Sequence, residues 1–492
     1  MKDNISIMHI SDSHRGKDTL ITNSALLTSL LNDKEKYTTA EVPLIQAPDI
    51  IIVCGDIIRG SENEDNSDQE IQHQYDEAIG FLTDLASEFL GGDKHRIVLV
   101  PGNHDVDWKY SRESMAKIDN TQVLDSNNQL KSEYLRQAIN QRSEIKWSWK
   151  ELSFYKIVNH DVYLKRFEAF SNFYEAFYDG RKSYSLIPDS QYDIFDFPEF
   201  KISIVGYNSC YNNDHLNLVG DIHPDCIASS TPRLKELAKK GGLQMAAWHH
   251  NTKGLPYDAN YMDSSRLKNF IESGIALGFH GHQHKTEIVR DYNNMIEQKK
   301  IVVFSAGTLC GGPGELPVGH NQQYNIVEIE PNPEDDSTMK VTLHTREKTS
   351  TSSFDNPIWG QGRIDSSNIS YIHTSIPKPV PATPTAALLE AEALLRENRC
   401  QDAKETLLQL DLSDPFVRKF LLESLSRTDD IDTICKIFNP PQNNEEAVHL
   451  LSATFNSGHK KMMAECIEHS FIKDSSDPAI REMRTKIKDY LS

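Results

Sequence analysis

The chain has 492 residues, of which 38% are hydrophobic and 9% aromatic, and a formal net charge of −20 at pH 7. This length and composition predict two or three globular domains and exclude an intrinsically disordered protein. The strongly acidic balance disfavours extended contact with nucleic acid or an anionic membrane, unless basic residues gather locally.

The first hundred residues alternate between strand and helix patterns. Apolar runs predict strands at residues 5–10, 49–53 and 96–100, and amphipathic patterns predict helices at 20–31 and 75–90. This β-α-β-α-β order implies parallel strands joined by right-handed crossovers.

More strands follow a polar insertion. Residues 106–196 are predicted to form a mostly helical insertion rich in aromatic side chains, whose interleaved charges favour a solvated face over a nucleic-acid rim. Further strands are predicted at 201–207, 243–247, 275–279, 300–305, 324–329 and 339–344. The last two resemble a hairpin, so we expect an α/β domain with a mixed sheet system to span residues 1–345.

The composition changes after residue 345. Residues 346–385 are polar and then rich in proline, which predicts an extended linker. Residues 386–492 show only helical patterns, with short helices at 386–398, 400–410, 415–425, 431–438, 445–456, 460–469 and 478–490. Paired helices of this size are typical of tetratricopeptide-like (TPR-like) helical hairpins, although no repeat consensus is present. This all-α domain could recruit a protein partner or pack against the α/β domain, and its mixed acidic surface does not identify a partner.

Five predicted strands are followed directly by Asp, Asn or His. The carboxyl ends of strands in an α/β sheet share one edge, where ligands bind. Side chains far apart in the sequence are therefore expected to converge there: Asp12, His14, Asp56, Asn103, His249, His282 and His284.

This set is typical of a site for two metal ions. Neighbouring divalent cations need a bridging carboxylate, several imidazoles and neutral oxygens. A single histidine after a strand is most simply structural, but five such elements in order are poorly explained by coincidence. Mixed oxygen and nitrogen ligation without cysteine fits Mn²⁺, which we expect, and also Fe, Ni²⁺, Co²⁺ or Zn²⁺.

The ordered motifs resemble those of the calcineurin-like metallophosphoesterase superfamily. They are Asp12-x-His14, Gly55-Asp56, Gly102-Asn103-His104-Asp105, His249 and Gly281-His282-x-His284. The resemblance implies a four-layer αββα sandwich with a binuclear centre. By this resemblance one metal would be held by Asp12, His14, Asp56 and His284. The other would be held by Asp56, Asn103, His249 and His282, with Asp56 as the bridge.

The same resemblance implies a mechanism. A hydroxide shared by the two metals would attack phosphorus. His104 would protonate the leaving group or stabilise the transition state, with Asp105 fixing its tautomer.

Three further residues are candidates for contact with the substrate. Arg15 could bind a phosphate, or form a surface salt bridge instead. Asn208 could line the pocket, or serve a turn. His250, beside the ligand His249, is expected either to support it or to face the substrate.

The leading hypothesis is a metal-dependent phosphoesterase that cleaves a phosphodiester or phosphomonoester, in a nucleotide or another small phosphorylated molecule. An alternative is a nuclease acting on DNA or RNA, against which the net charge weighs. A third hypothesis, from a different class, is a helical-repeat interaction protein with a subsidiary phosphoesterase domain. The intact ligand set argues against degeneration of that domain.

Compartment is predicted from three features. The seven cysteines lack CxxC pairs, which argues against a disulfide framework. No apolar run approaches the roughly eighteen residues of a membrane span, and the first residues lack the pattern of a secretion signal. We therefore expect a cytoplasmic protein without a membrane partner.

Overall fold

The computed structural model describes residues 4–16, 19–61, 67–127, 129–140, 143–254, 260–294, 299–364, 367–379 and 384–491. The chain divides into two compact units, Met1–Val380 and Pro381–Ser492. Each unit has its own hydrophobic core.

The first sheet of the N-terminal unit contains the predicted β-α-β-α-β segment. Its strand order is β15-β14-β13-β1-β2-β3, and β16 also pairs with β14. The strands are β1 (Ile5–Ile10), β2 (Ile50–Cys54), β3 (Ile97–Val100), β13 (Gln323–Pro331), β14 (Thr338–Lys348), β15 (Trp359–Gln361) and β16 (Tyr371–Pro377). The neighbours β1, β2 and β3 are parallel and buried on both faces, as their continuous apolar runs predict. Because Ile10 pairs with Val53, and Cys54 with Val100, their carboxyl ends lie level.

The second sheet has the order β11-β12-β10-β9-β8-β7. The strands are β7 (Tyr192–Phe197), β8 (Ile202–Tyr207), β9 (Leu243–Ala247), β10 (Leu277–His280), β11 (Ile288–Asn294) and β12 (Lys299–Ser305). The four central strands are parallel, and the edge strands β7 and β11 are antiparallel to their neighbours. The second sheet therefore also carries its central carboxyl ends on one edge.

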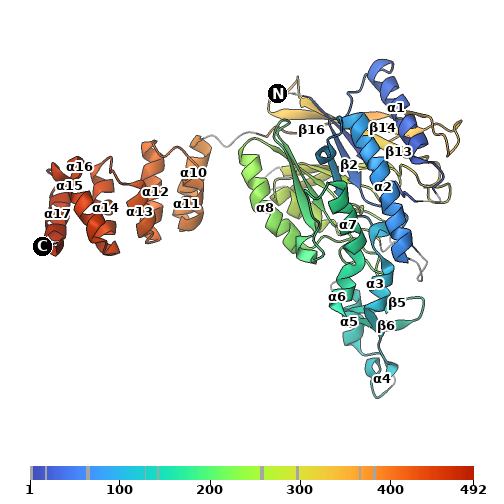
Figure 1. The fold of residues 1–492 in the computed structure, drawn as a ribbon, viewed down its shortest axis with the longest axis horizontal. Helices are drawn as coiled ribbons and strands as arrows, with labels where there is room; N and C mark the ends of the chain where they lie inside the picture. The colour runs from blue at the N-terminus through green and yellow to red at the C-terminus, as the bar shows by residue number, and fades with distance from the viewer. Residues whose placement is uncertain are drawn as a thin grey trace. The chain divides into compact units, whose positions relative to one another are not determined.

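Helices cover the outer faces of the two sheets, which pack against each other through β2 and β10 and through β3 and β8 (Figure 1). Helices α1 (Asn23–Thr39) and α2 (Ser67–Leu90) share a core with the first sheet, whereas α8 (Pro224–Lys239) and α9 (Ser265–Glu272) pack on the second. Helix α2 buries Ile71, Ala78, Phe81 and Leu85, the spacing of a helix with one face in the core. The expected α/β class is confirmed.

The insertion differs from the expectation of a mostly helical segment, because it contains a small antiparallel sheet in the order β4-β6-β5. Its elements are α3 (Trp108–Glu113), β4 (Met115–Lys117), α4 (Asn120–Val123), α5 (Ser132–Ile139), β5 (Ile145–Ser148), β6 (Ser153–Ile157), α6 (His160–Leu164) and α7 (Glu168–Phe177). Ile145 and Phe154 pack with Val123 in a separate core cluster. Strands this short leave only a weak alternation in the sequence.

The N-terminal unit also extends beyond residue 345, where the linker was expected to begin. Strands β15 and β16 both pair with β14, so residues 359–361 and 371–377 continue the first sheet. Trp359 and Ile376 are buried in its core. The sequence did not predict these strands, because only isolated apolar residues occur in this polar segment. Residues 365–366 and 380–383 of the expected linker lie outside the described residues.

The C-terminal unit is helical, as predicted. Its helices are α10 (Pro384–Arg396), α11 (Cys400–Leu407), α12 (Pro415–Arg427), α13 (Ile431–Ile437), α14 (Asn444–Ser457), α15 (Lys460–Glu468), α16 (Ser470–Lys473) and α17 (Pro478–Leu491). Asp414 caps the first turn of α12, and Gly458 ends α14 with a φ of 70°. Three core clusters of described residues hold the successive helices together.

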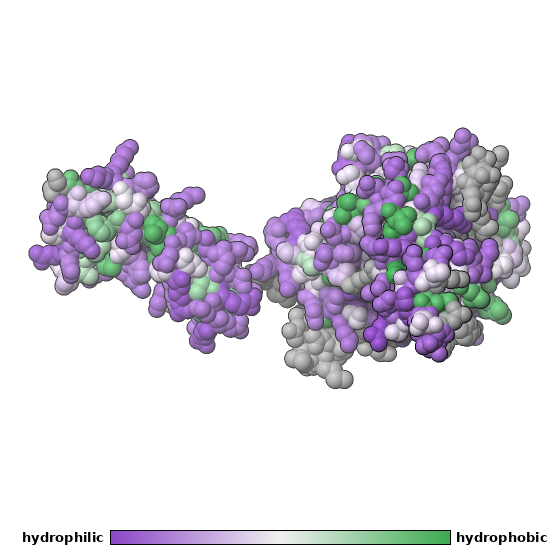
Figure 2. All heavy atoms as spheres, turned by 90° about the horizontal axis from the view of Figure 1, so that it is seen from below, coloured by the Kyte–Doolittle hydropathy of each residue, from purple (hydrophilic) through white to green (hydrophobic). Residues whose placement is uncertain are grey.

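The face of the molecule in Figure 2 is mostly hydrophilic, with small separate hydrophobic patches. Within the described residues, every helix is too short or too polar to span a bilayer.

Candidate metal centre

The predicted ligands come from five strand ends and lie together at one edge of the two sheets. Asp12 and His14 follow β1, Asp56 follows β2, and Asn103 follows β3. His249 follows β9, and His282 and His284 follow β10. Backbone bonds tie these loops together: the Asp12 N–H donates to the Gly55 carbonyl at 3.1 Å, and the His14 N–H to the Asp56 carbonyl at 3.0 Å.

Two groups of side chains could each hold a metal ion. The first is Asp12, His14 and His284, and the second is Asp56, His249 and His282; the ligand atoms of each group lie within 4.8 Å of one another. A third group of the same kind joins His14, Asp56 and His104. Asp56 thus belongs to two of the groups.

The spacing of the ligand atoms in the second group fits a cation. Asn103 Oδ1 lies 3.0 Å from both His249 Nε2 and His282 Nδ1, and the two imidazole nitrogens are 3.2 Å apart. His249 Nε2 is 3.3 Å from Asp56 Oδ2. Atoms bound to one ion at about 2.1 Å are roughly 3.0–3.4 Å apart in octahedral or tetrahedral geometry. The residues present therefore fit a divalent ion.

Backbone carbonyls orient three of the imidazoles. The Nδ1 atoms of His249, His284 and His104 each lie 2.7 Å from a carbonyl oxygen, of Cys54, Glu315 and Arg59 in turn. A carbonyl can only accept, so each Nδ1 carries the hydrogen and each Nε2 offers its lone pair. The Nε2 atoms of His249 and His284 face carboxylates, His284 lying 3.1 Å from Asp12 Oδ1. Outer partners of this kind orient histidines that bind metals.

The carboxylates of the centre favour positive charge on the neighbouring side chains. Burial alone would lower the pKa of His249, but Asp56 outweighs it and raises the pKa to about 9. The same balance between burial and Asp12 raises the pKa of His284 to about 9. Burial lowers the pKa of His282 to about 3. The carboxylates of Asp56 and Asp12 thus favour positive charge at the centre, which a bound cation would supply.

The backbone is strained at the same positions. Asp12, His14, Asp56, His282 and His284 have φ values of 53°, 42°, 48°, 72° and 56°. Half of the ten described non-glycine residues with positive φ are therefore candidate ligands. Such conformations cost energy and cluster at functional sites.

Glycines permit the close approach of these loops. A Cβ on Gly102 would lie 2.2 Å from the backbone nitrogen and Oδ1 of Asp56. A Cβ on Gly281 would lie 1.7 Å from Ser11 Oγ and 2.7 Å from Asp12 Oδ2. The glycines of both motifs therefore leave room for a neighbouring loop.

The structure changes the expected role of Asp105. It is buried and accepts from the N–H groups of Gly102 at 2.8 Å and Ile57 at 3.2 Å and from Tyr75 OH at 3.1 Å. Burial, and then the nearby Asp56, raises its pKa to about 7. Asp105 therefore holds the loops together, and the Arg59 carbonyl orients His104 in its place.

His104 itself stands at the open side of the centre. Its side chain is 45% exposed, and Nε2 lies 3.9 Å from Asp56 Oδ2. Nε2 of His104 is therefore accessible to a bound ligand in the structure as it stands.

Two expected substrate contacts lie buried within the fold. The Arg15 side chain is 1% exposed, donates from Nη2 to the Ile21 carbonyl at 2.9 Å, and lies over the Phe81 ring. Its Nε and Nη1 atoms have no hydrogen-bond partner among the described residues. Asn208 donates to Gln191 Oε1 at 2.8 Å and accepts from the Cys210 N–H at 2.7 Å, so its side chain is paired within the fold.

Ser209 belongs to residues 207–209, a segment that the sequence places at a strand end, where it could line the pocket or form a turn. Its hydroxyl lies 3.0 Å from Nδ1 of the buried His250 and accepts from the backbone N–H groups of His249 and His250. Its contact with His250 could not be read from the sequence, because it depends on the pairing of β8 with β9.

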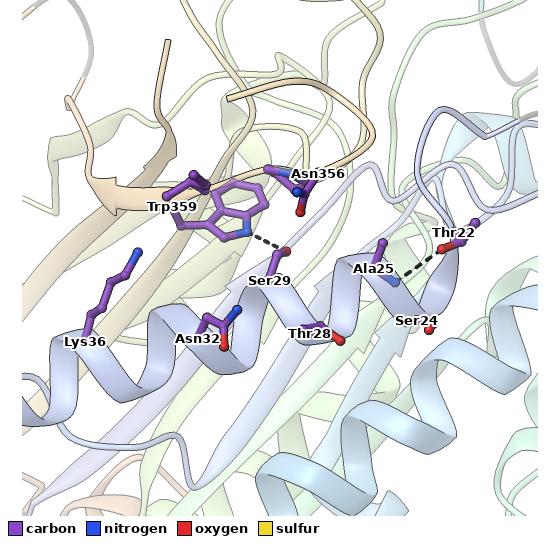
Figure 3. A pocket seen from close by; sticks show the side chains of 11 residues that line it. Thr22, Ser24, Ala25, Thr28, Ser29, Asn32, Lys36, Asn356 and Trp359 are labelled. Atoms are coloured by element: carbon purple, nitrogen blue, oxygen red, sulfur yellow. Dashed lines mark hydrogen bonds between the residues drawn. The ribbon is translucent and has the colours of Figure 1, made fainter. Parts of the chain in front are cut away.

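A polar cavity of about 430 Å³ lies apart from these groups, between α1 and residues 356–359 (Figure 3). Trp359 forms part of its wall and donates to Ser29 Oγ at 2.9 Å. None of its lining residues is a predicted site residue.

A comparison with family models agrees with the resemblance that the sequence motifs indicate. Residues 5–154 match the family model of calcineurin-like phosphoesterases. These residues thus correspond to a calcineurin-like phosphoesterase domain, and the match does not extend to the rest of the chain. Members of the family are hydrolases that act on phosphate esters. No curated protein sequence matches the chain significantly.

Solved structures that match the chain include the following three. A dimetal phosphatase from Danio rerio is 10% identical, covers 76% of this chain and 99% of its own, and has a TM-score of 0.38. GAP50, the anchor in the inner membrane complex of Plasmodium, is 11% identical, with coverages of 75% and 91% and a TM-score of 0.32. The calcineurin-like phosphoesterase YfkN from Bacillus subtilis is 10% identical, with coverages of 77% and 91% and a TM-score of 0.28.

Proposed function

We propose that the calcineurin-like domain hydrolyses a phosphodiester or phosphomonoester with two divalent metal ions, Mn²⁺ being the expected metal. The substrate would be a nucleotide or another small phosphorylated molecule. The observation that carries this proposal is the 3.0–3.3 Å spacing of Asn103 Oδ1, His249 Nε2, His282 Nδ1 and Asp56 Oδ2.

The proposed ligands divide between two ions. One would be held by Asp12, His14, Asp56 and His284, and the other by Asp56, Asn103, His249 and His282. When bound, the ions would activate water as the nucleophile and neutralise charge on the phosphoryl oxygens. The carbonyls of Cys54 and Glu315 fix the rings of His249 and His284, so their Nε2 atoms would be free to bind the ions.

His104 would supply the proton for the leaving oxygen. Its Nδ1–H stays on the Arg59 carbonyl, so a second proton on Nε2 points towards Asp56 and the open side of the centre. The exposed Nε2 can pass that proton to the leaving group as the ester bond breaks.

The proposal is tested by metal analysis combined with a substrate panel. The panel contains bis-p-nitrophenyl phosphate, p-nitrophenyl phosphate, mononucleotides, cyclic nucleotides and a single-stranded oligonucleotide. We expect two bound ions per chain and turnover of a small ester. Asp56→Ala should lose both, whereas Asp84→Ala, at an exposed carboxylate on α2, should keep both. Metal-independent turnover in Asp56→Ala would refute the proposal, and steeply salt-dependent cleavage of the oligonucleotide alone would favour a nuclease.

A further inference from the structure

His250 differs from the other imidazoles of the centre in what holds its ring. Its Nδ1 faces the hydroxyl of Ser209 at 3.0 Å, whereas His249, His284 and His104 place Nδ1 on a backbone carbonyl. A hydroxyl can donate as well as accept, so the contacts of Ser209 decide the tautomer of His250.

Both lone pairs of the Ser209 hydroxyl are already used. Its oxygen accepts from the backbone N–H of His249 at 3.1 Å and of His250 at 3.0 Å. The hydroxyl hydrogen remains to be donated, and Nδ1 of His250 lies within hydrogen-bond distance. Nδ1 is therefore the acceptor, and the one hydrogen of the neutral ring sits on Nε2.

A nitrogen that carries this hydrogen has no lone pair for a metal. The Nε2–H of His250 is a donor, and it is buried without a hydrogen-bond partner among the described residues. Leaving a buried donor unpaired is costly, so a ligand that accepts from it is favoured.

The ring of His250 lies beside the second group of candidate ligands, which contains His249 and His282. Its centroid is 4.7 Å from that of His282 and 5.3 Å from that of His249. The ring also packs against Gly220, where a Cβ would lie 2.4 Å from His250 Cγ. Besides Ser209, Cys210 Sγ lies 3.7 Å from Nδ1, so these two side chains and the backbone at Gly220 hold the ring.

We propose that His250 is a substrate-binding residue that donates its Nε2–H to a phosphoryl oxygen, and that Ser209 is the positioning residue that fixes this tautomer. The accepting ligand is a phosphate ester or orthophosphate. This inference rests on the proposed function and assigns His250 no metal.

The test compares two amide replacements in the metal-loaded, full-length protein. His250→Gln places an amide N–H near the position of Nε2, whereas His250→Asn, which is shorter, cannot reach it. Orthophosphate is the probe, through its inhibition constant and its binding heat with Mn²⁺ present, and metal content is measured in parallel. We expect His250→Asn to bind phosphate about tenfold to a hundredfold more weakly with two ions retained. His250→Gln should recover most of that loss.

The outcomes separate this inference from the proposed function. Loss of metal in His250→Asn would make His250 a metal ligand. Unchanged phosphate affinity would leave it a packing residue. Either result would overturn this inference and leave the proposed function standing. A wild-type chain that binds no phosphate with Mn²⁺ would overturn both.

A second measurement does not depend on how the variants fold. Imidazole ¹⁵N NMR of the wild-type protein distinguishes the two neutral tautomers. We expect the Nε2–H form for His250, and a hydrogen on Nδ1 at that ring would contradict the role given to Ser209.

Discussion

Gly102→Ala would place one methyl group against the proposed bridging ligand. The new Cβ would lie 2.2 Å from both the backbone nitrogen and Oδ1 of Asp56, whereas real Cβ contacts essentially never fall below 3.0 Å. Neither atom is the free end of a flexible side chain, because Oδ1 also accepts from the His104 N–H at 2.9 Å. The loop after β3 or the loop after β2 must therefore move.

The size of the effect follows from this clash. Relief requires a shift of about 1 Å, and overpacking of this kind costs about 1–3 kcal/mol of unfolding free energy. A misplacement of about 1 Å in a catalytic constellation can lower turnover about a hundredfold. We therefore expect Gly102→Ala to lose metal and about two orders of magnitude in kcat, while the protein remains folded.

The assay measures metal content, kcat on bis-p-nitrophenyl phosphate and denaturant unfolding side by side. Gly314→Ala is the matched control, because a Cβ on this loop glycine meets no atom within 4 Å. Wild-type metal content and turnover in Gly102→Ala would refute the argument that this glycine is required by the approach of Asp56.

Three other predictions follow from single contacts. His104→Ala should keep both metals but lower kcat by about 10²–10⁴, as measured by metal analysis and steady-state kinetics; unchanged kcat would remove its catalytic role. The raised pKa values of His249 and His284, about 9 against 6.5, stabilise the metal-free fold below about pH 6.5. Thermal unfolding of chelator-treated protein should show this stabilisation being lost as the pH rises towards 9. Metal affinity should increase over the same range, because a metal ion displaces the protons. A stability that does not change with pH would contradict the pairing of these histidines with Asp56 and Asp12. Arg346→Met would leave the buried Asp33 without its bidentate partner, bonded at 2.6 and 2.9 Å. Denaturant unfolding should then show a loss of about 3–5 kcal/mol, and a loss within experimental error would show that Asp33 is satisfied without the arginine.

Much of the fold was predictable because the central strands are continuous apolar runs. The predicted ranges 5–10 and 243–247 coincide with β1 and β9. Strand β16 was missed because Tyr371–Pro377 alternates weakly and buries mainly Ile376. Its place in the sheet depends on pairing with β14, a tertiary contact that no local pattern contains.

The candidate site was partly predictable for a related reason. Asp12, Asp56 and His249 each lie two residues beyond the end of a strand, so the topology alone brings them together. The orientation of the imidazoles was not predictable, because it depends on the carbonyls of Cys54 and Glu315, and every residue has a carbonyl. The contact of His104 with the Arg59 carbonyl was not predictable for the same reason.

The left-handed backbone at the strand ends has a consequence for how such a chain can evolve. Relative to glycine, a side chain in this conformation costs about 1–3 kcal/mol, and Asp12, His14, Asp56, His282 and His284 all adopt it. A descendant that no longer needs catalytic activity could replace these residues by glycine and unfold at a higher temperature. Folding stability and catalytic activity therefore favour different residues at these five positions. A lineage that keeps all five side chains retains a less stable fold than it could have.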